Sequence, residues 1–152
     1  RYDESATIEA GSDVVTFESP CGSVGLSICY DLRFPELFRA LLDLGADIFA
    51  VPSAFTAVTG RDHWQVLLRA RAIENQAFVV AANQFGTAEP HFDSWGHSLI
   101  VDPWGRVLAD AGEAEGYAIA DLDFAERDRI LGSLPAIHNR RPDLFRNGEG
   151  AA

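Results

Sequence analysis

The sequence predicts an α/β fold in which helices cover both faces of a sheet. Three apolar runs of strand length alternate with two stretches of helical periodicity, and continuous apolar strands are typical of sheets that are buried on both sides. Of the 152 residues, 47% are hydrophobic and 23% are charged, which suits one globular domain with a sizeable core.

The first half of the chain carries the alternating pattern. Its expected elements, in order, are a loop at 1–13, a strand at 14–17, a strand at 24–29, a helix at 35–44, a strand at 47–51, a helix at 63–76 and a strand at 77–82. Gly45 follows the first helix as a stop signal, and Pro52 ends the strand after it. Asp62 precedes the second helix at the position of an N-cap.

The second half has a different pattern. A Pro/Gly turn within residues 96–109 predicts a hairpin of two short strands. A further strand is expected at 117–122, followed by a helix at 124–131. The last residues, 147–152, have the composition of a frayed tail.

Composition excludes several classes of function. A formal net charge of −11 disfavours nucleic acid and anionic membrane surfaces as partners, because both attract clustered Lys and Arg. The apolar stretches are far shorter than the roughly 20 residues needed to span a bilayer. No spacing typical of a metal site occurs, and the complete absence of lysine excludes a phosphate-binding P-loop.

Cys29 is the strongest candidate for chemistry. It follows an apolar strand and precedes a helix, so a sharp turn would set its thiol at the sheet edge, where backbone N–H groups could face a reacting carbonyl oxygen. The alternative is a structural cysteine, since free cysteines are among the most buried residues. Cys21 lies in a turn and carries no such signal. With two cysteines no disulfide framework is expected, and a reduced, cytoplasmic setting fits best.

Charged residues near Cys29 have simpler interpretations. Arg33 and Glu36 are expected to form an ion pair at the start of a helix, and Glu74 to pair with an arginine one turn away in its own helix. The chain has four histidines, but no pattern places any of them beside Cys29. From the residues alone, Cys29 therefore stays one candidate nucleophile without an identified base.

Four longer motifs stand out, which in chain order are GLSICYDLRFPEL, HWQVLLRARAIENQAFVVAANQFG, SWGHSLIVDPWGRV and RRPDLF. Together they resemble the carbon–nitrogen hydrolase (nitrilase) superfamily. They extend over nearly the whole chain and are most similar to the Nit branch of small amidases. The resemblance implies about the C-terminal half of a four-layer αββα sandwich, so that residues 1–152 would form a partial domain truncated on its N-terminal side.

The resemblance also implies cysteine chemistry that needs no metal or cofactor. The family uses a Glu-Lys-Glu-Cys constellation, in which Cys29 matches the nucleophile that forms a thioester. The backbone N–H of Tyr30 would then help to bind the oxyanion. Glu4 lies in a shorter match, ESATIEAGSD, and corresponds to the second glutamate of the family, which orients the lysine and the substrate.

A substrate pocket is implied at Ser53, Phe55 and Thr56, where the family lines its site. The Nit-like motifs suggest a small carboxylate-bearing amide, of the 2-oxo-acid amide or deaminated-glutathione type, with water as the second substrate. Arg61 is a candidate partner for that carboxylate, although a solvated arginine is the simpler interpretation. Nitriles, carbamoyl amines and aliphatic amides stay open. Because family members commonly form dimers, a homodimer is also implied.

The absent lysine separates this chain from the family pattern. In the family, the lysine and the general-base glutamate precede the segment where this chain begins, so we expect the 152-residue chain alone to show no measurable amidase activity. The alternative function is a catalytically incompetent fragment that binds or pairs without turnover. Half a sandwich would also expose sheet edges and an apolar face, which predicts self-association.

Overall fold

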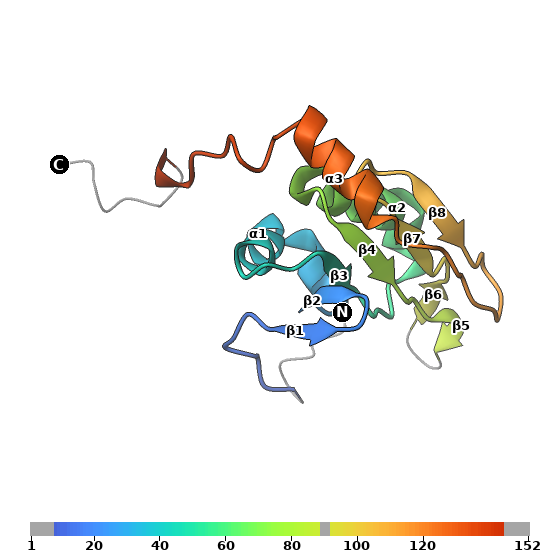
Figure 1. Cartoon of the computed structure of the whole chain (residues 1–152). Coiled ribbons are helices and arrows are strands. Elements are labelled where there is room, and N and C mark those ends of the chain that lie inside the picture. Colours follow the sequence, from blue (N-terminus) through green and yellow to red (C-terminus); the bar gives the residue numbers. More distant parts are fainter. Residues whose placement is uncertain (1–7, 89–91, 145–152) are drawn as a thin grey trace.

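A six-stranded sheet forms the centre of the molecule (Figure 1). The computed structural model describes residues 8–88 and 92–144. The strands lie side by side in the order β1 (Thr16–Ser19), β2 (Gly22–Leu26), β3 (Ile48–Ala50), β4 (Phe78–Ala81), β7 (Leu99–Val101) and β8 (Val107–Asp110). Two further strands, β5 (Phe85–Ala88) and β6 (Phe92–Trp95), form a separate hairpin.

The centre of the sheet is parallel. β2 pairs with β3 and β3 with β4 in parallel, and these strands are connected by helices α1 (Pro35–Asp43) and α2 (Ala57–Asn75). β1, β7 and β8 join as antiparallel strands at the two sides. The structure therefore confirms the α/β class, and it brings the carboxyl ends of β2, β3 and β4 to one end of the sheet.

One face of the sheet is covered by α1 and α2. Gly25, Phe49, Val79 and Val101 lie next to one another in register on this face, and the three larger residues are fully buried. A Cβ atom on Gly25 would lie 3.1 Å from the Leu41 side chain, so the glycine lets α1 approach closely. The same core contains Leu32, Phe38, Val51, Phe55, Trp64, Leu68 and Ala72.

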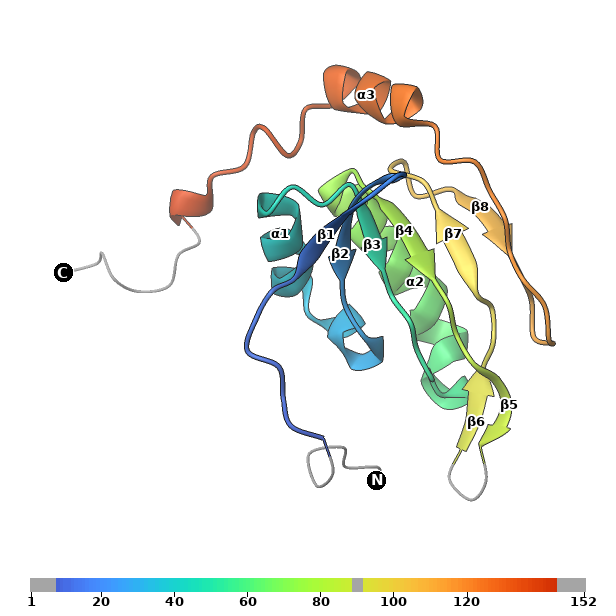
Figure 2. The same cartoon turned by 60° about the horizontal axis from the view of Figure 1, so that its bottom comes forward.

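The opposite face is covered only in part. Leu26 and Val80, near the carboxyl ends of β2 and β4, are 42% and 37% exposed there. Nearer the start of β4, Phe78 is buried against Phe124 of α3 (Phe124–Ser133), with ring centroids 5.2 Å apart. Figure 2 shows α1 and α2 together on the other side. The sequence predicts that both faces are covered. This prediction is wrong for the carboxyl half of the second face, because no described helix packs over it.

Helix α3 docks at the amino ends of β3 and β4. Its Arg127 forms a 2.8 Å ion pair with Asp47, just before β3, and donates a hydrogen bond to the carbonyl of Gln76, just before β4. The Gln76 side chain in turn donates to the carbonyl of Leu134, directly after α3. The expected helix at 124–131 is thus confirmed, and its polar contacts close this end of the sheet.

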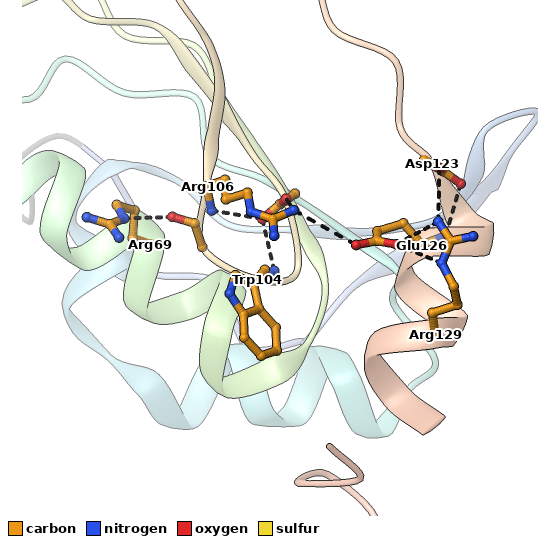
Figure 3. Close-up of polar contacts among 8 residues, drawn as sticks. Arg69, Trp104, Arg106, Asp123, Glu126 and Arg129 are labelled. Atoms are coloured by element: carbon orange, nitrogen blue, oxygen red, sulfur yellow. Dashed lines mark hydrogen bonds and ion pairs between the residues drawn. The ribbon is translucent and has the colours of Figure 1, made fainter. Parts of the chain in front are cut away.

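The first turn of α3 also contacts the turn between β7 and β8 (Figure 3). Glu126 pairs with Arg129 at 2.6 Å and lies 3.9 Å from Arg106 of that turn. The turn itself is organised by Asp102, whose carboxylate accepts the N–H groups of Trp104 and Arg106. The antiparallel pair β7–β8 confirms the hairpin expected at 96–109.

Helix α2 begins six residues earlier than the sequence predicts. It starts at Ala57 after the extended Thr56, so Asp62 lies inside the helix and is not its N-cap. The first turn is fixed by close packing: a Cβ atom on Gly60 would lie 2.3 Å from the Trp95 side chain of β6. The hairpin β5–β6, which supplies this tryptophan, was not predicted.

Two other expectations differ from the structure. Residues 117–122 form no strand, because their apolar side chains find no neighbouring strand: Tyr117 is 82% and Ile119 77% exposed. The first strand lies at Thr16–Ser19 and not at 14–17. The expected tail at 147–152 lies outside the described residues.

Candidate active site

The candidate site lies at the carboxyl ends of the three parallel strands. Cys29 follows β2, Ser53 follows β3 and Asn83 follows β4. Ser53 and Asn83 extend the parallel pairing beyond β3 and β4 as an isolated bridge. Carboxyl ends of neighbouring parallel strands are a common place for ligand sites in α/β folds, so the position alone makes this end of the sheet the first candidate.

Cys29 lies in a sharp turn, as the sequence predicts, and its backbone there is strained. The residue has a φ of 46°, in the left-handed region that few non-glycine residues adopt, and it opens a short 3₁₀ helix, Cys29–Arg33, which we call the Cys29 turn. The Cys29 N–H donates to the carbonyl of Pro52 at 2.9 Å, which ties the turn to the loop after β3. The thiol is free, and the residue is half-buried at the edge of the core.

Asp31 closes the Cys29 turn. Its carboxylate accepts the N–H of Ile28 at 2.8 Å, and its own N–H donates to the carbonyl of Ile28. The Phe34 N–H donates to the carbonyl of Asp31 and leads into α1. These local bonds explain why the chain turns sharply after Cys29.

Tyr30 presents an unused backbone donor next to the thiol. No group in the described part of the chain accepts a hydrogen bond from its N–H, whereas the N–H groups of Cys29 and Asp31 on either side are bonded. The Tyr30 side chain is 62% exposed and packs edge-on against Phe34. An N–H beside the nucleophile without an acceptor is the arrangement that can bind a developing oxyanion.

Arg33 does not form the expected ion pair with Glu36. Within the described residues its guanidinium has no carboxylate partner. It contacts the hydroxyl of Thr59 and a ring nitrogen of His63 instead, at 3.4 and 3.2 Å. The guanidinium lies over the rings of Tyr30 and Phe55, 5.6 and 5.0 Å from their centroids. The expected pair is wrong because the side chain extends toward α2, where the guanidinium, four residues after Cys29, has no acidic partner among the described residues.

The three predicted pocket residues follow β3 in one loop. Phe55 is 3% exposed and packs against Trp64, so its ring belongs to the core. The Thr56 hydroxyl lies 3.1 Å from the hydroxyl of Thr59, near Arg33. The Ser53 hydroxyl makes only a long contact, 3.4 Å, with a carbonyl in its own loop. Of the three, only Thr56 has a side-chain polar group linked to Arg33, because its hydroxyl contacts the same Thr59 hydroxyl that the Arg33 guanidinium contacts.

Asn83 is a residue that the sequence analysis missed. Its side chain accepts the Phe55 N–H at 2.8 Å and donates to the carbonyl of Gly96 at 2.7 Å. Its backbone N–H donates to the Ser98 hydroxyl. Asn83 thereby joins the loop after β3 to the segment between β6 and β7. A polar residue directly after an apolar strand was the available signal.

Other predicted site features lie elsewhere. Glu4 is outside the described residues. Arg61 is exposed and lies within α2. Within residues 8–88 and 92–144, no histidine hydrogen-bonds the Cys29 thiol, and no group of three His, Cys, Asp or Glu side chains is placed to hold a metal ion. None of the described helices is long and apolar enough to cross a bilayer.

The sequence and the fold of this chain are similar to those of known proteins. The family model described as carbon-nitrogen hydrolase matches residues 1–130. The chain belongs to the carbon–nitrogen hydrolase family. Deaminated glutathione amidase from Synechocystis sp. (strain PCC 6803 / GT-S) is 50% identical over 141 residues, which are 91% of this chain and 52% of that protein.

Solved structures of this family have the same fold. The NitFhit protein of C. elegans superposes with a TM-score of 0.90 at 46% identity, over 95% of this chain and 35% of that one. A variant of the amidase from Nesterenkonia sp. AN1 gives a TM-score of 0.77 at 30% identity, over 95% of this chain and 51% of that one, and shows covalent addition of an acetamide moiety at its active-site cysteine. The chain thus spans about half the length of its relatives or less.

Proposed function

We propose that the protein is an amidase that hydrolyses non-peptide carbon–nitrogen bonds in small molecules, with Cys29 as its nucleophile. The observation that carries the proposal is the Cys29 turn, where a free thiol in strained backbone lies beside the N–H of Tyr30, which has no acceptor among the described residues. Family membership and the amidase names of the relatives support it. In a variant of the amidase from Nesterenkonia sp. AN1, the acetamide moiety of fluoroacetamide is added covalently to the active-site cysteine, which shows that this cysteine is reactive in that protein.

The proposed reaction has two steps. The Cys29 sulfur attacks the amide carbon, and the carbonyl oxygen becomes an oxyanion that accepts the Tyr30 N–H. The C–N bond then breaks, the nitrogen leaves as ammonia or an amine after taking up a proton, and a thioester remains. Water attacks the thioester, and its C–S bond breaks to give the carboxylic acid and the free thiol.

The groups that move protons come from the family pattern. A general-base glutamate and a lysine would be supplied by the preceding part of the full-length protein, because the 152 residues contain no lysine. Glu4 would orient that lysine and the substrate. The thiol can react only as thiolate, so these groups would determine how much of Cys29 is active.

We propose that the substrate is an amide that carries a carboxylate. Arg33 supports this choice, because its half-buried guanidinium lies near the nucleophile without an acidic partner among the described residues. Arginine binds carboxylates through two parallel hydrogen bonds, and the Thr56 and Thr59 hydroxyls lie nearby as further donors. Arg61 is less suited, because it is exposed. The deaminated glutathione amidases are consistent with such a substrate class.

Ammonia release tests the proposal directly. The full-length protein, with its natural N-terminal part, is incubated with a 2-oxo-acid amide, and ammonia is measured over time. We expect release by the wild type and a fall of at least about 10³-fold in Cys29→Ala, with Cys21→Ala unchanged as the matched control. Release that persists in Cys29→Ala would reject the proposed nucleophile.

Two further expectations belong to the same experiment. The 152-residue chain alone should release no ammonia, since it lacks a lysine, and turnover by this chain would show that the family lysine is dispensable. We also propose that the full-length protein is a homodimer, as the family resemblance implies; light scattering tests this, and a monomeric mass would contradict it.

A further inference from the structure

We infer that Arg71 is a positioning residue for Cys29: it holds the Cys29 turn through the carbonyl of Leu32, so that the thiol and the Tyr30 N–H face the same substrate carbonyl. The inference rests on the proposed amidase function. Arg71 lies on α2 and does not touch the thiol. The Leu32 carbonyl, at the end of the Cys29 turn, lacks a backbone hydrogen-bond donor among the described residues.

The carbonyl of Leu32 cannot be satisfied by the backbone. In a 3₁₀ helix this oxygen would accept the N–H of the residue three positions later, but that residue is Pro35, which has no N–H. Among the described residues no other backbone N–H donates to it. Leu32 itself is fully buried away from bulk solvent, and a buried carbonyl without a partner is costly.

Arg71 supplies what the backbone lacks. Its Nε and Nη2 atoms donate to the Leu32 carbonyl at 3.1 and 2.8 Å, while Nη1 pairs with Glu74 at 2.9 Å. The guanidinium lies 5.3 Å from the centroid of the Phe38 ring, and the residue is only 5% exposed. A buried cation is tolerated here because all three of its nitrogens are bonded and an acid balances its charge.

The Cys29 turn is therefore held at both ends. At its start, the Cys29 N–H is bonded to Pro52 after β3, and at its end the Leu32 carbonyl is bonded to Arg71 on α2. The Tyr30 N–H lies between these two anchors. A φ of 46° at Cys29 is unfavourable and persists only while the surroundings enforce it. Loss of the Arg71 anchor would let the turn relax and move the thiol away from the N–H.

The geometry requires arginine and not merely a positive charge. Two N–H groups of one planar guanidinium converge on a single oxygen, and a third reaches Glu74. A lysine ammonium can keep the charge and the pairing with Glu74 but cannot reproduce this fork. Arg71→Lys therefore separates positioning from charge, whereas Arg71→Gln removes both.

The test compares Arg71→Lys and Arg71→Gln with Arg69→Lys. Arg69 lies on the same helix and also donates to a backbone carbonyl, that of Gly105, but in the turn between β7 and β8 (Figure 3). In the full-length protein kcat and KM for a 2-oxo-acid amide are measured. In the same proteins, amide hydrogen exchange is measured at residues 30–34.

For Arg71→Lys we expect kcat to fall by about 10–100-fold with KM within about threefold, because a small misplacement of reacting groups costs that much. Exchange at 30–34 should rise about tenfold, and Arg69→Lys should change neither quantity. A kcat within about twofold of the wild type in Arg71→Lys would overturn the inference. An equal fall in Arg69→Lys would also overturn it, because the effect would then be general destabilisation.

Two safeguards keep the test decisive. If Arg71→Gln fails to fold, kcat and hydrogen exchange can still be measured in Arg71→Lys, which keeps the charge. If the wild type shows no amide hydrolysis, the proposed function fails, while hydrogen exchange continues to test the anchor by itself: unchanged exchange at 30–34 in Arg71→Lys would overturn the inference.

Discussion

The two ends of the same three parallel strands are built in opposite ways. At the amino ends of β3 and β4, α3 closes the sheet, and the side chains of Asp47 and Gln76 are bonded to Arg127 and to the chain after α3. At the carboxyl ends, the Arg33 guanidinium has no acidic partner among the described residues, and the Tyr30 N–H has no acceptor there.

The difference extends to the face that α1 and α2 do not cover. Near the amino end, Phe78 is buried under Phe124 of α3, whereas Leu26 and Val80 near the carboxyl end stay partly exposed. One end is completed by the described chain itself, whereas at the other end these polar and apolar groups have no such partner among the described residues.

The first prediction concerns the closed end and has the largest effect on stability. Phe124→Ala should lower the free energy of unfolding by about 2–3 kcal/mol, since a half-buried ring that packs against Phe78 is lost. Denaturant unfolding measures this, with Tyr117→Ala, an exposed aromatic, as the control that should cost less than about 0.5 kcal/mol. The rate of Cys29 alkylation should stay unchanged. A large change in that rate would mean that the two ends are coupled.

The second prediction concerns the open end and has its effect on the substrate. Arg33→Gln should raise KM for carboxylate-bearing amides by about 10–100-fold, equivalent to about 1.4–2.7 kcal/mol, and leave neutral amides nearly unaffected. Stability should change little, because the guanidinium has no acidic partner to lose among the described residues. Arg61→Gln, at an exposed position, is the matched control. Equal effects on charged and neutral amides would contradict the role of Arg33.

The third prediction has the smallest effect on stability. Leu26→Ser should change the free energy of unfolding by less than about 0.5 kcal/mol but reduce self-association of the 152-residue chain in light scattering, since Leu26 is part of the exposed apolar face. Leu44→Ser, an exposed position after α1, should not reduce association. Association that is unchanged in Leu26→Ser would show that this face does not cause it.

Local signals explain what could be predicted. Strand β2, the Cys29 turn and α1 follow from an apolar run, a cysteine and a helix-starting Pro35, all adjacent in sequence. The i,i+3 pair of Arg71 and Glu74 is likewise local and is confirmed. Family motifs assigned chemistry to Cys29, although position alone left it open.

Contacts between distant segments explain what could not be predicted. The start of α2 depends on Gly60 packing against Trp95, which is 35 residues away in the chain. Arg33 was expected to pair with nearby Glu36 but extends toward α2 instead. The contacts of Asn83 and the bond from Arg71 to the Leu32 carbonyl also depend on residues distant in the chain. The strand expected at 117–122 is absent, because an apolar pattern does not show whether a neighbouring strand is available for pairing.

The most direct test is to trap the acyl-enzyme at the open end of the sheet. The full-length protein is mixed with a carboxylate-bearing amide, quenched with acid within the first turnover, digested and analysed by mass spectrometry. We predict that the acyl mass appears on the peptide containing Cys29 and not on the peptide containing Cys21. Ammonia release without any acyl mass on the Cys29 peptide, or an acyl group on a different residue, would contradict the assignment of Cys29 as the nucleophile.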